Sequence, residues 1–352
     1  MNIIKKEKKT DRKKAKYTGL PTSGPYKVCE TFAILADETR KDPFEKDGSA
    51  RETPVHFFFP KTEGEERFPL VIFSHGAFGF YKSNYSTYKE LASCGYVVAA
   101  LDHPHHAFKT KDSARKTVRV DGSFMKSVRI QGASRDPETL YPIYTEWMDL
   151  RVKDMNFAAD TIKAAAQSGE AGERWFVPEG NEEDILCALR ACRGDKLGLI
   201  GHSVGGAAAV ELGRERDDVS AVVDLDGTML GEYSGIDDGK FTVREEPYPV
   251  PVLDFVNWDH YSVNLPAYRE EGGVYPNDVL IRSAKEGFST TVRGTKHMDF
   301  TDLPIFSPFL GRMLGSGECD KAQTMNTVNR LVRSFFDRYL KNKGEFEVSE
   351  EY

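Results

Sequence analysis

The sequence predicts an α/β domain built on a mostly parallel sheet with helices on both faces. Short apolar runs of the kind buried inside a parallel sheet alternate with helical segments, and no internal repeat is present. The chain has 352 residues, 39% of them hydrophobic, which is ample for a buried core. We therefore expect a single domain over residues 18–352, preceded by a basic flexible tail over residues 1–17.

The alternation can be followed along the chain. The expected strands are residues 55–59, 69–74, 96–102, 196–200, 220–226, 251–256 and 288–294. The expected helices cover residues 84–94, residues 145–166, a small-residue segment from 204, and a last segment through 325–339. Residues 18–53 are turn-rich and charged, and we expect them to wrap around the domain. Residues 103–144 and 227–248 are expected to be irregular excursions over the edge of the sheet.

The charge distribution argues against nucleic acid as a partner. The net charge is −7, and residues 1–16 carry eight Lys and Arg against two acids, so the rest of the chain carries −13. Such an acidic body disfavours a nucleic-acid groove.

No apolar run reaches the ~18 residues of a membrane span, and no signal-peptide core follows the early lysines. The chain as written is expected in the cytoplasm, or outside it or on a membrane if it is a piece of a longer protein.

The stretch LIGHSVGG, residues 199–206, is typical of a nucleophile elbow. A strand leads into GxSxG, and small residues then open a helix. Gly201 and Gly205 suit a strained strand-to-helix turn, where side chains would collide with neighbouring backbone. Ser203 is therefore the candidate nucleophile of an α/β-hydrolase fold.

A serine nucleophile needs a base, and the base needs an orienting acid. In this architecture the order along the chain is Ser, acid, His. His297, in RGTKHMDF, follows the last expected strand and is the candidate base. Two acids are open: Asp226, at the end of the strand after the nucleophile, and Asp259, at the end of the next strand.

The reaction also needs an oxyanion hole. The stretch VIFSHGAFG, residues 71–79, runs from a strand into a glycine turn, so the backbone N–H groups of Ala77 and Val204 are the candidate donors.

The other histidines are given no catalytic role. We expect His202 to have a packing role and His260 to lie on a surface loop. The histidines of DHPHHAF, residues 102–108, match no common metal-ligand spacing and are expected to line the pocket rim. The predicted chemistry requires no metal and no organic cofactor.

Several of these motifs, taken in order, make a resemblance specific. FSHGAFG, LASCGYVVAALDHP, GHSVGG, VVDLDGTM and GTKHMDF together resemble the plasma-type, calcium-independent platelet-activating-factor acetylhydrolases and their bacterial lipase relatives. The resemblance runs from about Thr18 to about Lys343. It implies Ser203 as nucleophile, Asp226 as acid and His297 as base. Asp226 is followed here by Gly227 and Thr228 instead of the family's small residue and aromatic, which bears on pocket shape and acyl-chain preference.

Two other function classes compete with this interpretation. DLDGT also resembles the nucleophile loop of Mg²⁺-dependent haloacid-dehalogenase-type phosphatases, with Asp224 as nucleophile and Asp226 as acid/base, but the downstream Lys and acidic pair fall too early. The other class is a non-catalytic α/β-hydrolase-fold binding protein, which usually lacks a triad member.

The favoured prediction is a serine carboxylic-ester hydrolase that acts on short acyl esters. Its possible substrates include phospholipids, from which it would remove the sn-2 acyl group. No protein partner is implied. The apolar segment 303–314 either packs against the core, the favoured alternative, or meets an acyl chain or lipid surface.

Overall fold

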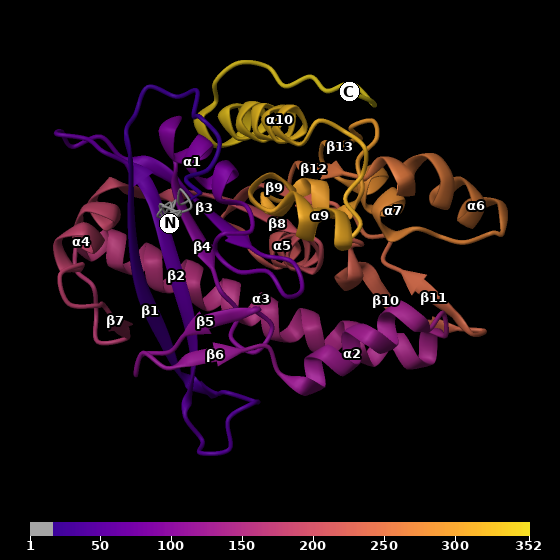
Figure 1. Ribbon diagram of the computed structural model, residues 1–352, viewed down its shortest axis with the longest axis horizontal. Helices are drawn as coiled ribbons and strands as arrows, with labels where there is room; N and C mark the ends of the chain where they lie inside the picture. The colour runs from indigo at the N-terminus through magenta and orange to yellow at the C-terminus, as the bar shows by residue number, and fades with distance from the viewer. Residues whose placement is uncertain (1–16) are drawn as a thin grey trace, which may run out of the picture.

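The computed structural model describes residues 17–352, and its centre is a nine-stranded sheet (Figure 1). The predicted tail lies outside the described residues except for Tyr17, whose hydroxyl donates to Asp302. The strand order is β13-β12-β9-β8-β3-β4-β2-β1-β7. These strands are β1 Val28–Lys41, β2 Ala50–Pro60, β3 Phe68–Ser74, β4 Val97–Leu101, β7 Trp175–Phe176, β8 Cys192–His202, β9 Val219–Leu225, β12 Val252–Phe255 and β13 Gly287–Thr290.

The sheet is parallel where the site is built. From β13 to β4 every neighbouring pair is parallel, whereas β4–β2, β2–β1 and β1–β7 are antiparallel. Because parallel strands end at one edge, the loops that follow β3, β8, β9 and β12 meet there. All the predicted strands are present, but β2 begins five residues and β8 four residues earlier than predicted, and β13 ends four residues earlier.

One expectation about the first part of the chain is wrong. Residues 18–53 were expected to wrap around the domain, but they contain β1, the longest strand, which pairs with β2 along most of its length. Within the apolar run Phe32–Ala36, residues 33–36 are buried and form most of the buried part of β1. Turn-rich and charged neighbours on both sides hide this run in the sequence.

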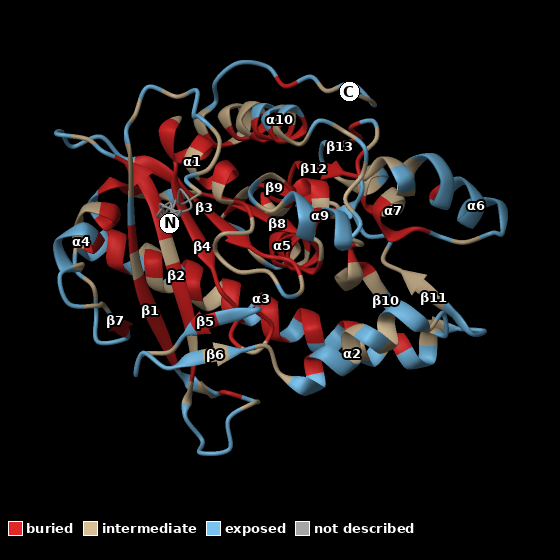
Figure 2. Ribbon diagram, in the orientation of Figure 1, coloured by how far each residue is buried: buried red, intermediate tan, exposed pale blue. Residues whose placement is uncertain are grey.

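Helices cover both faces of the sheet, as predicted (Figure 1). On one face lie α1 and α10, and on the other lie α3, α4 and α5, each packed through its apolar side on the strands. Their bounds are α1 Tyr85–Ser93, α3 Pro137–Ser168, α4 Glu182–Ala191, α5 Val204–Glu215 and α10 Lys321–Lys341. Figure 2 shows the strands and the inner sides of these helices buried.

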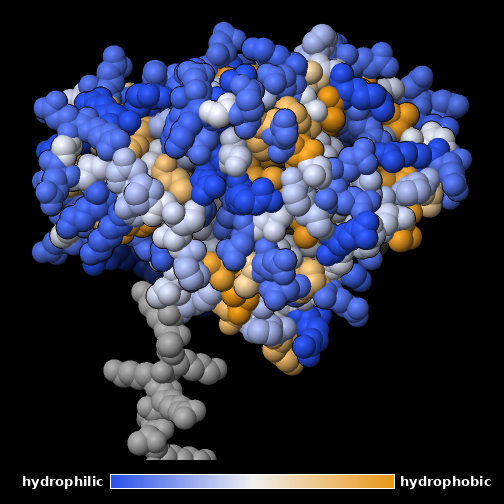
Figure 3. Space-filling model, turned by 90° about the horizontal axis from the view of Figure 1, so that it is seen from above, coloured by the Kyte–Doolittle hydropathy of each residue, from blue (hydrophilic) through white to orange (hydrophobic). Residues whose placement is uncertain are grey.

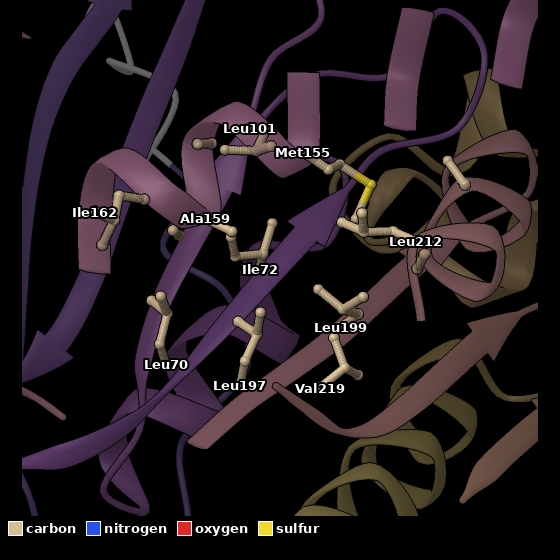
Figure 4. Packing of buried hydrophobic residues seen from close by; sticks show 14 of the residues in the cluster. Leu70, Ile72, Leu101, Met155, Ala159, Ile162, Leu197, Leu199, Leu212 and Val219 are labelled. Carbon is tan, nitrogen blue, oxygen red and sulfur yellow. The ribbon is translucent and has the colours of Figure 1, made fainter. Parts of the chain in front are cut away.

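The packing of α3 follows from its sequence pattern. Met155, Ala159 and Ile162 recur at helical spacing, are fully buried, and lie over the strand residues of the same cluster (Figure 4). Truncating such a side chain costs about 2–5 kcal/mol of unfolding free energy, because a cavity is left behind.

The two segments expected to be irregular contain regular elements. Residues 103–144 hold the hairpin β5 Lys109–Lys111 and β6 Thr117–Arg119, the helix α2 Gly122–Ala133, and the start of α3. Residues 227–248 hold the turn η1 Leu230–Glu232 and the hairpin β10 Tyr233–Asp237 and β11 Lys240–Val243. Asp121 and Asp136 cap α2 and α3 by accepting from backbone N–H groups, a signal the sequence carried.

The segment 303–314 does not pack as expected. It forms α8 Leu303–Phe306 and α9 Pro308–Met313. Phe309 is 79% exposed and Met313 63%, so the favoured core-packing alternative is wrong for these side chains. Figure 3 shows that apolar side chains gather in patches on an otherwise mostly hydrophilic face. Over the described residues, no helix is both long and apolar enough to cross a membrane.

Candidate active site

Ser203 stands on a tight turn between β8 and α5. Its backbone has φ 57° and ψ −129°, a conformation that non-glycine residues rarely adopt. A Cβ on Gly201 would lie 2.2 Å from the carbonyl carbon of Gly205, and one on Gly205 would lie 2.1 Å from the carbonyl oxygen of Ser74. The two glycines of GxSxG are therefore required for the turn to form, which is the geometry that the motif predicts.

The structure brings His297 and Asp226 together. Nδ1 of His297, at the start of the turn η3 His297–Phe300, lies 2.6 Å from Oδ2 of Asp226, which directly follows β9. The Asp226 side chain is 5% exposed and that of His297 46%. Asp259, the other candidate acid, is 54% exposed and faces Lys296 at 3.5 Å. The geometry thus selects Asp226 as the partner of His297.

Asn257 is a site residue that the sequence analysis missed. Its backbone N–H donates to Oδ1 of Asp226 at 2.7 Å, and its side-chain amide donates to both carboxylate oxygens at 3.0 Å. Asn257 lies just past β12, at the same edge of the sheet as Asp226. Its place after a buried strand was a signal, but the sequence could not show which side chain it would meet. These hydrogen bonds fix the carboxylate so that Oδ2 faces His297.

The candidate oxyanion donors lie beside Ser203. Ala77 is in the turn after β3, and Val204 is the first residue of α5. Within the part of the chain that the structure describes, neither backbone N–H donates to a protein acceptor. Both residues line the same pocket as Ser203, so two free donors are available where an oxyanion would form.

The pocket that contains these groups has a volume of about 290 Å³. One wall is formed by α2 and α3, including Tyr144 and Trp147, and the other by the loops after β9 and β12. The remaining lining residues are Ala77, Val128, Gln131, Ser203, Val204, Asp226, Thr228, Leu230, Asn257, His260, Tyr275 and His297. Such a volume suits a small acyl group next to the seryl oxygen.

Two neighbouring histidines differ in how well they were predicted. His202 is buried, its Nε2 lies 3.1 Å from the carbonyl oxygen of His297, and burial lowers its pKa to about 3, so the predicted packing role is confirmed. His260 was expected on the surface, but it lines the pocket and packs against Tyr275. Burial lowers the pKa of His260, and its Nε2 has no hydrogen-bond partner among the described residues.

The histidine-rich loop does not line the pocket rim as expected. His103 lies behind it, with Nε2 at 2.8 Å from Ser74 Oγ and Nδ1 at 3.0 Å from Asp154 Oδ2. All three side chains are fully buried, so this second Ser–His–Asp chain cannot meet a substrate. Burial lowers the pKa of His103 to about 4, and the Arg51 guanidinium holds the pKa of Asp154 well below its usual range.

The buried chain instead supports the turn that carries Ala77, the candidate oxyanion donor. Arg151, on α3, donates to the carbonyl oxygen of His75, the residue that leads into the turn with Ala77. His75 Nε2 accepts from the backbone N–H of His103 at 3.2 Å. The network therefore ties the end of β3 and its turn to α3 and to the loop after β4.

The alternative interpretation of DLDGT fails on accessibility. Asp224 is fully buried, so it cannot meet a phosphoester as a nucleophile. Among the described residues, no group of three or more His, Cys, Asp or Glu could hold a metal ion. Of the two aspartates in the motif, only Asp226 reaches the pocket.

The chain is similar to known proteins over most of its length. Residues 50–351 match the family described as platelet-activating factor acetylhydrolase, isoform II. The chain is 24% identical over 288 residues to the platelet-activating factor acetylhydrolase of Bos taurus, covering 80% of this chain and 59% of that protein. Identity to the corresponding protein of Canis lupus familiaris is 25% over 309 residues, covering 84% and 62%. The chain thus spans less than two thirds of the length of these relatives.

A solved structure shares the fold. The ferulic acid esterase of Streptomyces cinnamoneus superposes with a TM-score of 0.65 at 21% identity, covering 92% of this chain and 93% of that one. With the mostly parallel sheet, this likeness confirms the predicted α/β-hydrolase fold. The match over residues 50–351 confirms the resemblance seen in the motifs: the chain belongs to the platelet-activating factor acetylhydrolase isoform II family.

Proposed function

We propose that this protein is a serine carboxylic-ester hydrolase that acts on short acyl esters. The observation that carries the proposal is the contact between His297 and Asp226 in the pocket that also holds the strained Ser203 turn. Family membership and the esterase fold support the same chemistry.

In the proposed mechanism Ser203 attacks the ester carbonyl and His297 accepts its proton, which it then gives to the leaving alcohol. Asp226 fixes the imidazole tautomer by accepting from Nδ1–H and stabilises the imidazolium that forms. Water repeats these steps to release the acid from the acyl-enzyme. Asn257 keeps Asp226 in position throughout.

The N–H groups of Ala77 and Val204 would bind the tetrahedral oxyanion. Backbone donors fixed before the reaction cost no reorganisation when the charge develops, and removing one such donor in other enzymes costs about 10²–10³-fold in kcat. Here the donors are held by the start of α5 and by the buried network around His75.

The substrate class is the finer part of the proposal. The small pocket favours a short acyl group, and the relatives are named platelet-activating factor acetylhydrolases, which indicates an acetyl group as the acyl part. The exposed apolar side chains of α9, including Phe309 and Met313, would let the protein rest on a lipid surface.

Hydrolysis of p-nitrophenyl acetate tests the proposal. Wild type should release p-nitrophenolate, and Ser203→Ala should lose nearly all of this activity, while Ser262→Ala, which removes an exposed hydroxyl, should keep it. An acyl-chain series should show the highest kcat/KM for the shortest chains. Magnesium-dependent phosphate release that survives Ser203→Ala would favour a phosphatase, and no turnover of any ester would favour a binding protein.

A further inference from the structure

Two buried carboxyl groups lie together beneath the Asp226 turn. Asp224 on β9 and Asp254 on β12 are register partners in neighbouring parallel strands, and they are 0% and 1% exposed. Their side chains are in hydrogen-bonding contact with each other. A carboxyl pair so placed requires an explanation, because burying a charge without a cation is costly.

The contact implies a shared proton. Two ionised carboxylates cannot stay in contact at a dry site, so the pair retains at least one proton near neutral pH. The carboxylates of Asp226 and Asp278 also act on the pair and add to the cost of a second negative charge. Tyr248 and Tyr275 interact with the pair as well, and burial raises the pKa of both hydroxyls well above its usual range, so they stay uncharged. Burial raises the pKa of Asp224 well above its usual range and that of Asp254 to about 7.

The pair is bonded to the backbone that carries Asp226. Both oxygens of Asp224 accept from the N–H of Gly227 at 3.1 Å. Asn277, on the helix α7 Pro276–Ser283, approaches Oδ1 of Asp254 at 3.3 Å and donates to the carbonyl oxygen of Gly227 at 2.8 Å. The side-chain oxygen of Asn277 accepts from Met229 N–H at 3.0 Å. Every peptide group after Asp226 in this turn is thus tied to the pair or to Asn277.

Two glycines leave the space that the Asp224 carboxyl occupies. A Cβ on Gly206, in the first turn of α5, would lie 1.7 Å from Oδ1 of Asp224. A Cβ on Gly227 would lie 2.5 Å from the same oxygen and 2.5 Å from the carbonyl oxygen of Ser203. The Asp224 carboxyl therefore lies between the helix that begins at the nucleophile and the turn that carries the acid. Asp226 itself has φ 60°, so this turn needs support from its neighbours.

We propose that Asp224 and Asp254 share a proton and act together as positioning residues that hold Asp226 against His297. The inference rests on the proposed ester hydrolysis for its catalytic part, whereas the shared proton can be tested without any substrate. Loss of the shared proton would place two charges in contact and loosen the turn, so the pair sets an alkaline limit on activity.

The first experiment measures thermal unfolding of wild type and Asp254→Asn between pH 5 and pH 8. The folded pair holds protons that the unfolded chain has released, so its contribution to stability falls as pH rises from about 4 through the raised pKa values. Asparagine keeps the shape, can donate to Asp224 and never ionises. The Tm of Asp254→Asn minus that of wild type should therefore increase from pH 5 to pH 8. For the control Asp217→Asn, at an exposed position, the same difference from wild type should not change with pH.

The second experiment measures kcat/KM for an aryl acetate against pH. Asp254→Asn should stay within threefold of wild type at pH 7 and move the alkaline limb to higher pH. Asp224→Leu removes the acceptor of Gly227 N–H and should lower kcat at least tenfold with little change in KM. If that variant does not fold, Asp224→Asn, which keeps one acceptor oxygen, should show the same alkaline shift as Asp254→Asn.

The outcomes separate the two proposals. A difference in Tm between Asp254→Asn and wild type that does not change with pH would overturn the shared proton, whether or not the protein hydrolyses esters. A pH-dependent Tm difference with an unmoved alkaline limb would overturn the positioning role. A wild type that hydrolyses no ester would overturn the proposed function and with it the positioning role, while the Tm result would still decide the shared proton.

Discussion

His297 Nδ1 lies 2.6 Å from Asp226 Oδ2, and the same carboxylate accepts three hydrogen bonds from Asn257. The histidine comes from the loop after β13, the aspartate from the end of β9 and the asparagine from the end of β12. Three strands of the parallel sheet thus build one hydrogen-bonded unit beside Ser203. The orientation of the imidazole depends on Asn257 as well as on Asp226.

Replacing Asn257 tests this dependence. Asn257→Ala keeps the backbone hydrogen bond but removes the two from the amide, so the carboxylate can rotate away from His297. We expect kcat for an aryl acetate to fall about 10–100-fold, with KM nearly unchanged, because the loss affects the transition state. Asn264→Ala, at an exposed position nearby, is the control. Full activity in Asn257→Ala would show that Asp226 needs no such support.

Gly205 is the position where the elbow tolerates no side chain. In Gly205→Ala the new Cβ would lie 2.1 Å from the Ser74 carbonyl oxygen, so β3 and α5 would have to separate. We expect a loss of at least about 3 kcal/mol in unfolding free energy, measured by urea denaturation. At Gly172 a Cβ would meet nothing within 4 Å, so Gly172→Ala should unfold like wild type.

The buried histidines should contribute less to stability as the solution becomes acidic. Burial keeps His103 and His202 neutral, with pKa values lowered to about 4 and about 3. The unfolded chain binds protons at these histidines below about pH 6.5 and the folded chain does not, so each can remove up to about 1.4 kcal/mol per pH unit below that value. Because the buried Asp224–Asp254 pair acts in the opposite direction, the histidine contribution is measured as the difference in unfolding free energy between wild type and His202→Gln, by urea denaturation at pH 7, 6 and 5. Wild type should lose stability relative to His202→Gln as pH falls. A difference that is constant over this range would contradict the neutral, buried state of His202.

The exposed apolar side chains of α9 and of Leu314, the residue that follows it, should matter only for substrates in a lipid surface. The triple variant Phe309→Ser, Met313→Ser and Leu314→Ser removes side chains that are 79%, 63% and 54% exposed. We expect reduced co-sedimentation with phosphatidylcholine vesicles and unchanged kcat/KM for soluble p-nitrophenyl acetate. A matched substitution of the exposed Val274 to Ser should affect neither measurement. Equal vesicle binding by the triple variant and wild type would remove α9 from the proposal.

Much of the fold could be predicted because local signals were strong. The buried strands read as apolar runs, and Gly201 and Gly205 marked the elbow without any knowledge of the surroundings. Strand β1 was missed because the apolar run Phe32–Ala36 is short and its flanks are charged. The hairpins and α2 were missed because polar surface segments give weak periodicity.

Candidate site residues could be predicted where they belong to a sequence motif, and less well where their role depends on contacts in the folded chain. Ser203 and His297 follow from spacing and order, but the choice between Asp226 and Asp259 needed the geometry. Asn257 and Asn277 carry no motif, since their roles depend on strands that are distant in the sequence. Asp224 suggested a phosphatase nucleophile as part of DLDGT. Its structural role becomes clear only when Asp254, its partner on the neighbouring strand, is known.

The most direct test of the account is covalent labelling with a fluorophosphonate, followed by peptide mapping. The reagent reacts with a serine only where a base and an oxyanion hole activate it. We predict one labelled serine, Ser203, with labelling lost in His297→Ala and slowed in Asn257→Ala. The exposed-hydroxyl control Ser262→Ala should label as fast as wild type. Absence of labelling, or labelling of a serine other than Ser203, including the buried Ser74, would contradict the account.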